Sequence, residues 1–122
     1  MFADLEVTMP LPLYQAKAEL LRTLGHPARI RILELLAERD HAVHELLDQI
    51  SIEASNLSQQ LGVLRRTGLV TSTRRDGAVV YSMGVPEVRE FLLTARQILT
   101  RLAAAQTEFE PELARRPTTS TR

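Results

Sequence analysis

Short hydrogen-bonding side chains gather on one side of the segment 53–67. Leu57, Leu61 and Leu64 recur at the spacing of an amphipathic helix and are expected to face the interior. The opposite side then carries Ser55, Gln59, Gly62 and Arg66, flanked by Asn56, Ser58 and Val63. Hydroxyls and amides near a helix N-terminus can hydrogen-bond base edges, asparagine and glutamine pairing best with adenine, and the terminus itself suits a phosphate. The pattern favours a helix that reads DNA; a polar face that only contacts solvent is the alternative.

Positive charge is concentrated between residues 54 and 83. The whole chain has 15 basic and 15 acidic residues and a formal net charge of zero, whereas this segment contains Arg65, Arg66, Arg74, Arg75 and Asp76 as its charged residues. The second arginine pair precedes a turn, where it could meet phosphates or the minor groove, although solubility of an exposed hairpin is the alternative. We therefore predict DNA contacts from Ser55, Asn56, Ser58, Gln59, Gln60, Arg65, Arg66, Arg74 and Arg75.

Helices and one β-hairpin are predicted to position these residues. Apolar periodicity indicates helices over 13–24, 27–39, 43–50 and 53–67 and a long helix after Pro86. His26 is expected to cap the second helix before Pro27. Two β-prone runs, 70–75 and 78–83, are joined by Asp76-Gly77, which suits a two-residue hairpin turn. The fold class is therefore mainly α (α+β), a winged helix-turn-helix of about five helices with a hairpin wing.

Length and composition exclude several classes of protein. A chain of 122 residues that is 44% hydrophobic is expected to form one domain, here over 12–110, with a flexible arm at 1–11 and a disordered tail at 111–122. No apolar run is long enough to span a bilayer, so a cytoplasmic location is expected. The chain has no cysteine, which excludes disulfides, thiolate nucleophiles and cysteine-ligated zinc. No phosphate-binding loop or Ser-His motif points to an enzyme.

Three stretches of the sequence resemble the ArsR/SmtB family of winged-helix repressors. They are the residues Leu24–Leu33, the residues Asn56–Val70, and Arg74-Arg75-Asp76-Gly77 with the hairpin that ends at Tyr81. The resemblance implies a homodimer that binds imperfect palindromes near its own promoter and releases DNA when it senses a ligand. It also implies a dimer interface made by the first and last helices. The matching apolar positions are Leu13, Leu20, Leu24, Phe91, Leu92, Ala95, Ile98, Leu99 and Leu102.

The sequence departs from the metal-sensing relatives at their ligand positions. Where relatives carry Cys-Val-Cys on the third helix, this chain has Ala42-Val43-His44, and the last-helix ligand positions fall on Val85, Glu87, Ile98 and Arg101. Isoleucine cannot ligate a metal and arginine repels one. We therefore expect no metal and no cofactor. Three inducers stay open: a non-metal small ligand, a protein partner, or the abundance of the repressor itself.

Two alternative functions are retained. His41 and His44 are three residues apart, a spacing that could bring both imidazoles to one helical face for a metal-responsive repressor. The other alternative is a winged helix that docks on a partner protein. Such modules usually expose apolar side chains, whereas the outer face predicted for 53–67 is polar, so double-stranded DNA is the favoured partner.

Overall fold

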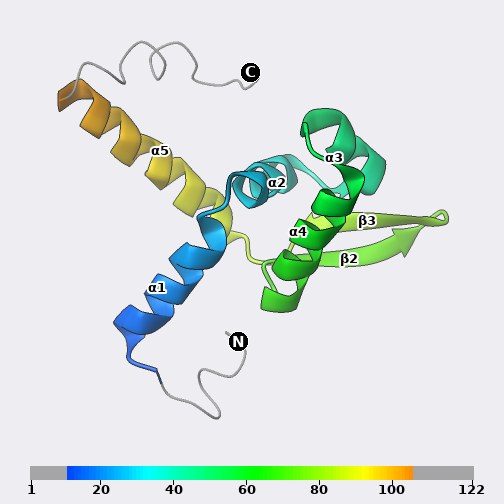
Figure 1. Ribbon diagram of the computed structural model, residues 1–122, viewed down its shortest axis with the longest axis horizontal. Helices are drawn as coiled ribbons and strands as arrows, with labels where there is room; N and C mark the ends of the chain where they lie inside the picture. Colours follow the sequence, from blue (N-terminus) through cyan, green and yellow to red (C-terminus); the bar gives the residue numbers. More distant parts are fainter. Residues whose placement is uncertain (1–10, 106–122) are drawn as a thin grey trace. The chain divides into compact units, whose positions relative to one another are not determined.

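The computed structural model describes residues 11–105 of the chain, so the predicted tail and most of the predicted arm lie outside the described residues. Its elements are α1 (Leu13–Leu24), α2 (Pro27–Glu38), β1 (His41–Ala42), α3 (Val43–Gln49), α4 (Ala54–Thr67), β2 (Val70–Arg75), β3 (Ala78–Met83) and α5 (Glu87–Ala105) (Figure 1). The chain divides into two compact units, one ending at Val88 and the other beginning at Arg89, within α5. The predicted order of five helices around a hairpin is confirmed.

The junction between α1 and α2 is built by local capping. Gly25 follows the last residue of α1, and a Cβ at this position would lie only 3.1 Å from the carbonyl oxygen of Leu21. His26 caps α2 as predicted, because its Nδ1 accepts a hydrogen bond of 3.2 Å from the backbone N–H of Ala28. Pro27 occupies the first turn, where its missing N–H costs nothing. The chain therefore turns from one helix into the next within two residues.

The start of α3 and the end of α4 are each stabilised by a local cap. The carboxylate of Glu45 accepts a 2.8 Å hydrogen bond from the backbone N–H of Ala42, which satisfies a donor that α3 leaves free. This bond, with help from the nearby Arg39, holds the pKa of Glu45 below its usual value. At its far end α4 stops at Gly68, whose φ of +87° is left-handed and whose N–H bonds the carbonyls of Arg65 and Leu64. The end predicted for this helix at residue 67 is thus confirmed.

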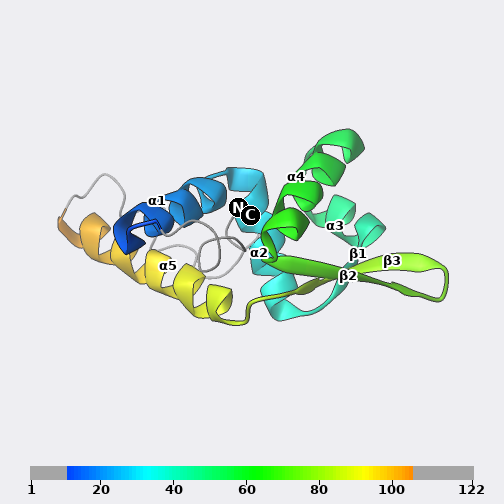
Figure 2. The same cartoon turned by 90° about the horizontal axis from the view of Figure 1, so that it is seen from below.

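The hairpin belongs to a three-stranded antiparallel sheet in the order β1-β3-β2. Arg75 pairs with Ala78 across the turn, where Asp76 and Gly77 have φ values of 50° and 81°, as a two-residue hairpin requires. β1 was not predicted: no strand was expected at His41, which pairs with Tyr81 of β3. A strand of two residues is too short to show any periodicity. Figure 2 shows the hairpin extending beyond α3 and α4 as a wing.

Leucine and isoleucine side chains of α2, α3 and α4 form the core of the unit that ends at Val88. The larger side chains with under 2% of their surface exposed are Ile32, Leu33, Leu46, Leu57, Leu61, Leu64 and Val70. The first two come from α2, which contacts α4 and β3. The three leucines of α4 are buried as predicted, so its polar side faces outward. No helix in the described range 11–105 combines the length and hydropathy needed to cross a bilayer.

Candidate nucleic-acid interface

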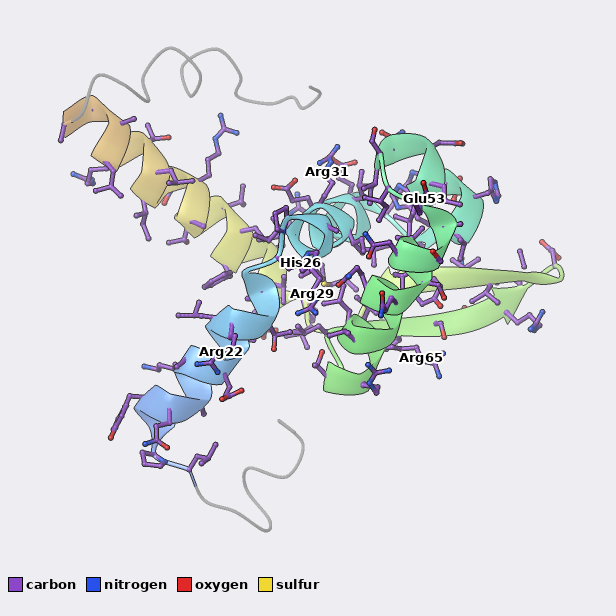
Figure 3. The ribbon with its side chains drawn as sticks, viewed as in Figure 1. Arg22, His26, Arg29, Arg31, Glu53 and Arg65 are labelled. Atoms are coloured by element: carbon purple, nitrogen blue, oxygen red, sulfur yellow. The ribbon has the colours of Figure 1, made fainter. Side chains whose placement is uncertain are left out.

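The outward side of α4 carries exposed hydrogen-bonding groups. Ser55, Ser58 and Gln59 are exposed in its first half, and Arg65 and Arg66 are exposed at its end. The buried leucine stripe fixes this orientation, because a helix that buries one side must present the other. Figure 3 shows Arg65 on the last turns of α4 and Glu53 just before its first residue. The face predicted to read DNA is therefore accessible along the length of the helix.

Gln60 does not belong to this face, and the expectation that it contacts DNA is corrected. Its side chain is 7% exposed and lies on the inner side of α4. Its Oε1 accepts a 2.8 Å bond from Nε of Arg29, and its Nε2 donates a 2.9 Å bond to Oδ1 of Asn56. Asn56 is half-buried and remains at the edge of the outward face. Gln60 is three residues after Leu57 and four before Leu64, so helical spacing places it on the buried side of α4.

The wing presents two arginines beside its turn. Arg74 is exposed and donates a long bond of 3.4 Å from Nη1 to the carbonyl of Gly77. Arg75 is also exposed, but its Nη2 lies 2.7 Å from Oδ2 of Asp40, which follows α2. That hydrogen bond, with a second from Ser82, lowers the pKa of the Asp40 carboxyl. Arg75 retains further donors for a phosphate, because a guanidinium has five N–H groups.

The two histidines considered for a metal are not arranged as a pair. His41 lies in β1 with 2% of its surface exposed, and its Nδ1 is 2.9 Å from the carbonyl oxygen of Arg39. His44 lies exposed on α3. The expectation that a helix could bring both imidazoles to one face is thus wrong, since only His44 is helical. Within residues 11–105, no three histidine or carboxylate side chains are close enough together to hold a metal ion.

The residues predicted for the dimer interface differ in exposure. On α1, Leu13 is 69% exposed, whereas Leu24 is 4% exposed and is therefore corrected to a core residue. Leu20 is half-buried. On α5, described by itself, the half-buried members are Leu92 and Ala95, and the exposed members are Phe91, Ile98, Leu99 and Leu102. Large apolar side chains that were not predicted are also exposed, namely Leu11, Tyr14, Leu21 and Leu93.

Two contributors to the interface were missed in the sequence. Asp40 is the ionic partner of Arg75, and Arg29 is the hydrogen-bond partner of Gln60. Each pair is separated by more than thirty positions, 35 and 31 residues respectively. Local periodicity in the sequence does not indicate contacts between residues so far apart along the chain, so only the folded structure shows them.

The exposed polar helix α4 follows a short helix and a turn, and a basic antiparallel hairpin comes next in the chain. This arrangement defines a winged helix-turn-helix of the DNA-binding class. Residues 26–72 match the family described as "Bacterial regulatory protein, arsR family". The chain is 56% identical over 92 residues to Rv0081, an HTH-type transcriptional regulator of Mycobacterium tuberculosis, covering 75% of this chain and 81% of the relative. The chain belongs to the ArsR family and is a DNA-binding transcriptional regulator.

Solved structures show the same fold. The crystal structure of Rv0081 has a TM-score of 0.73 at 53% identity and covers 80% of this chain and 98% of that chain. The transcriptional repressor BigR from Xylella fastidiosa has a TM-score of 0.62 at 35% identity, covering 70% of this chain and 84% of that chain. The biofilm growth-associated repressor of the same organism is 44% identical over 66 residues, covering 54% of this chain and 58% of the relative. The predicted fold and family are thus confirmed.

Proposed function

We propose that the chain is a dimeric repressor that binds a palindromic operator, with α4 in the major groove and the wing on the DNA backbone. The observation that carries the proposal is the exposed polar side of α4, which ends in Arg65 and Arg66 and lies in the same unit as the basic wing. In a two-fold dimer, two such helices reach successive major grooves about one turn of DNA apart.

The residues divide into two roles in this proposal. Ser55, Asn56, Ser58 and Gln59 read bases, because hydroxyls and carboxamides at the start of a helix can reach the edges of base pairs. The four arginines, Arg65, Arg66, Arg74 and Arg75, hold phosphates, because guanidinium groups pair with phosphate oxygens at any sequence. The first set would determine which sequence is bound and the second how tightly any sequence is bound.

Exposed apolar side chains support self-association. Leu13 on α1 and Ile98 on α5 are 69% and 55% exposed, and Leu99 and Leu102 on α5 are each 49% exposed. An exposed series of large apolar residues along a helix is unfavourable in water and is typical of a protein interface. A second copy of this chain is the partner that matches the imposed symmetry of a palindromic site.

Repression is proposed because similar proteins are described as repressors. The signal is proposed to be something other than a metal, because several ligand positions of metal-sensing relatives carry side chains here that do not ligate. At one of them, Ile98 is apolar and at another, Arg101 is cationic. A small ligand, a protein partner and control by abundance alone are the three sources of regulation that fit.

The test is a gel-shift titration of the purified protein with the DNA upstream of its own gene and with a scrambled duplex of equal length. We expect tighter binding to the upstream DNA, steep weakening as salt rises, and no effect of zinc, nickel or a chelator. Gln59→Ala should change the preferred sequence, while Gln97→Ala on α5 serves as the matched control. Equal, weak binding of both duplexes would contradict sequence-specific recognition and favour a protein-docking role. Loss of binding with zinc or nickel would contradict the metal-independent signal.

A further inference from the structure

Arg29 connects three helices of the unit that ends at Val88. Its side chain lies between α2 and α4 (Figure 3). Nε donates a 2.8 Å hydrogen bond to Oε1 of Gln60 on α4, and Nη1 donates a 3.0 Å bond to the carbonyl oxygen of Thr23 in the last turn of α1. Gln60 in turn donates from Nε2 to Oδ1 of Asn56 at 2.9 Å. These three hydrogen bonds form a continuous network, here called the relay, from the end of α1 to the edge of the DNA-facing side of α4.

The donor and acceptor atoms of the relay can be assigned in only one way. A guanidinium is a donor at every nitrogen, so the atom of Gln60 that faces Arg29 must be its oxygen. The amide nitrogen of Gln60 then faces Asn56, so the atom of Asn56 that faces Gln60 must also be its oxygen. Because Gln60 is 7% exposed, a reversed amide would leave buried polar atoms without partners, which is costly.

We propose that Arg29 and Gln60 are positioning residues that fix the carboxamide direction of Asn56, so that Asn56 offers its NH₂ group to DNA. The inference rests on the proposed reading of bases by α4. An NH₂ donor suits base edges that present acceptors in the major groove, namely O6 and N7 of guanine or O4 of thymine, and it disfavours the N4 amino group of cytosine. Asn56 would thereby act as a hydrogen-bond donor to bases. An unconstrained asparagine would instead pair best with adenine, through both its oxygen and its NH₂ group.

Gln60→Glu tests the direction of the relay with little change of shape. A carboxylate at position 60 accepts from Arg29 and can only accept from Asn56, which would turn the Asn56 carboxamide and offer its oxygen to DNA. The measurement is selection from a duplex library with randomised bases, followed by affinities for single-base variants. The position read by Asn56 is the one whose preference disappears in Asn56→Ala.

At that position the wild-type protein should prefer guanine or thymine over cytosine by about three- to tenfold, the range expected for one hydrogen bond. Gln60→Glu should reverse the preference toward cytosine or adenine, and the double variant with Asn56→Ala should behave like Asn56→Ala alone. A role in packing alone would lower affinity for all sequences equally and leave the ratio unchanged. That result, or a reversal that persists without Asn56, would overturn the inference.

Arg29→Met provides a second route if Gln60→Glu does not fold, as judged by circular dichroism. Without the donor-only group, the amides of Gln60 and Asn56 can adopt either direction, so the preference should fall to within about twofold while binding persists. An undiminished preference would contradict the inference. If Asn56→Ala changes no position, the inference fails while salt-sensitive, sequence-specific binding by the wild type still supports the proposed function. Loss of specific binding in the wild type would refute the proposed function itself.

Discussion

Replacing both wing arginines tests the interface most directly. Arg74 and Arg75 are exposed on the last rungs of β2, opposite Val79 and Ala78. The substitutions Arg74→Ala and Arg75→Ala leave the backbone ladder intact and remove no buried side chain. Exposed changes of this kind usually alter the free energy of unfolding by within about 0.5 kcal/mol. The variant should therefore stay folded, so any change in DNA binding reports on the side chains themselves.

The expected magnitude follows from the number of phosphate contacts. Two arginines in each chain give four contacts in a dimer, and each contact contributes about 0.9 to the slope of log affinity against log salt. The slope of the double variant should be shallower by up to about 3.6 units. Between roughly 50 and 200 mM salt, the fold-loss of affinity would then be about 150 times smaller in the variant than in the wild type. This is an upper limit, because Arg75 shares its donors with Asp40 at 2.7 Å.

Fluorescence anisotropy on the upstream duplex and on a scrambled duplex, over a series of salt concentrations, measures this slope. The matched control is Arg22→Ala with Arg31→Ala, which removes the same charge from α1 and α2 (Figure 3). We expect the wing variant to weaken binding to both duplexes by the same factor, since phosphate contacts carry no sequence information. A slope equal to that of the control variant, or a loss confined to the upstream duplex, would refute the assignment of the wing.

Three further outcomes are expected. Leu99→Asp on α5 should convert a dimer to monomers in light scattering, while Gln97→Asp on the same helix should not; dimers in both variants would exclude this face. Gly68→Ala should lower the free energy of unfolding by about 1–2 kcal/mol in urea titrations, because φ is +87°, and an unchanged midpoint would contradict that strain. The pKa of Glu45 is lowered in the folded state, so this group stabilises the fold above pH 4.5, its usual pKa, and the stabilisation is lost as pH falls through the lower folded value. In Glu45→Gln, the free energy of unfolding should therefore depend less steeply on pH in the acid range. An equally steep decline in the variant would remove Glu45 as the cause.

The sequence predicts the helices, the hairpin and the outward side of α4 because each depends on local spacing. Leu57, Leu61 and Leu64 are separated by one helical turn, and Asp76-Gly77 adopts the positive φ values that its turn needs. Gly68 stops α4 for the same kind of local reason. Signals of this kind act within a few residues and need no knowledge of the rest of the chain.

Tertiary structure decided the points at which the sequence analysis was wrong or silent. β1 exists only because His41 and Ala42 meet β3, about forty residues further along the chain. The same pairing buries His41 and places it in a strand, whereas His44 belongs to α3. Leu24 fits the apolar period of its helix equally well as a core or an interface residue, and only packing assigned it to the core.

The sequence by itself determined the class of this protein: helix periodicity, turn residues and a basic segment in a neutral chain indicate a winged helix that binds DNA. Only the tertiary structure decided which distant residue holds Gln60 on the inner side of α4. Gln59 and Gln60 are identical in chemistry and adjacent in sequence, yet one is exposed and the other is bonded to Arg29. The physical reason is that hydrogen-bond satisfaction in the interior depends on partners brought together by packing, which sequence spacing does not encode.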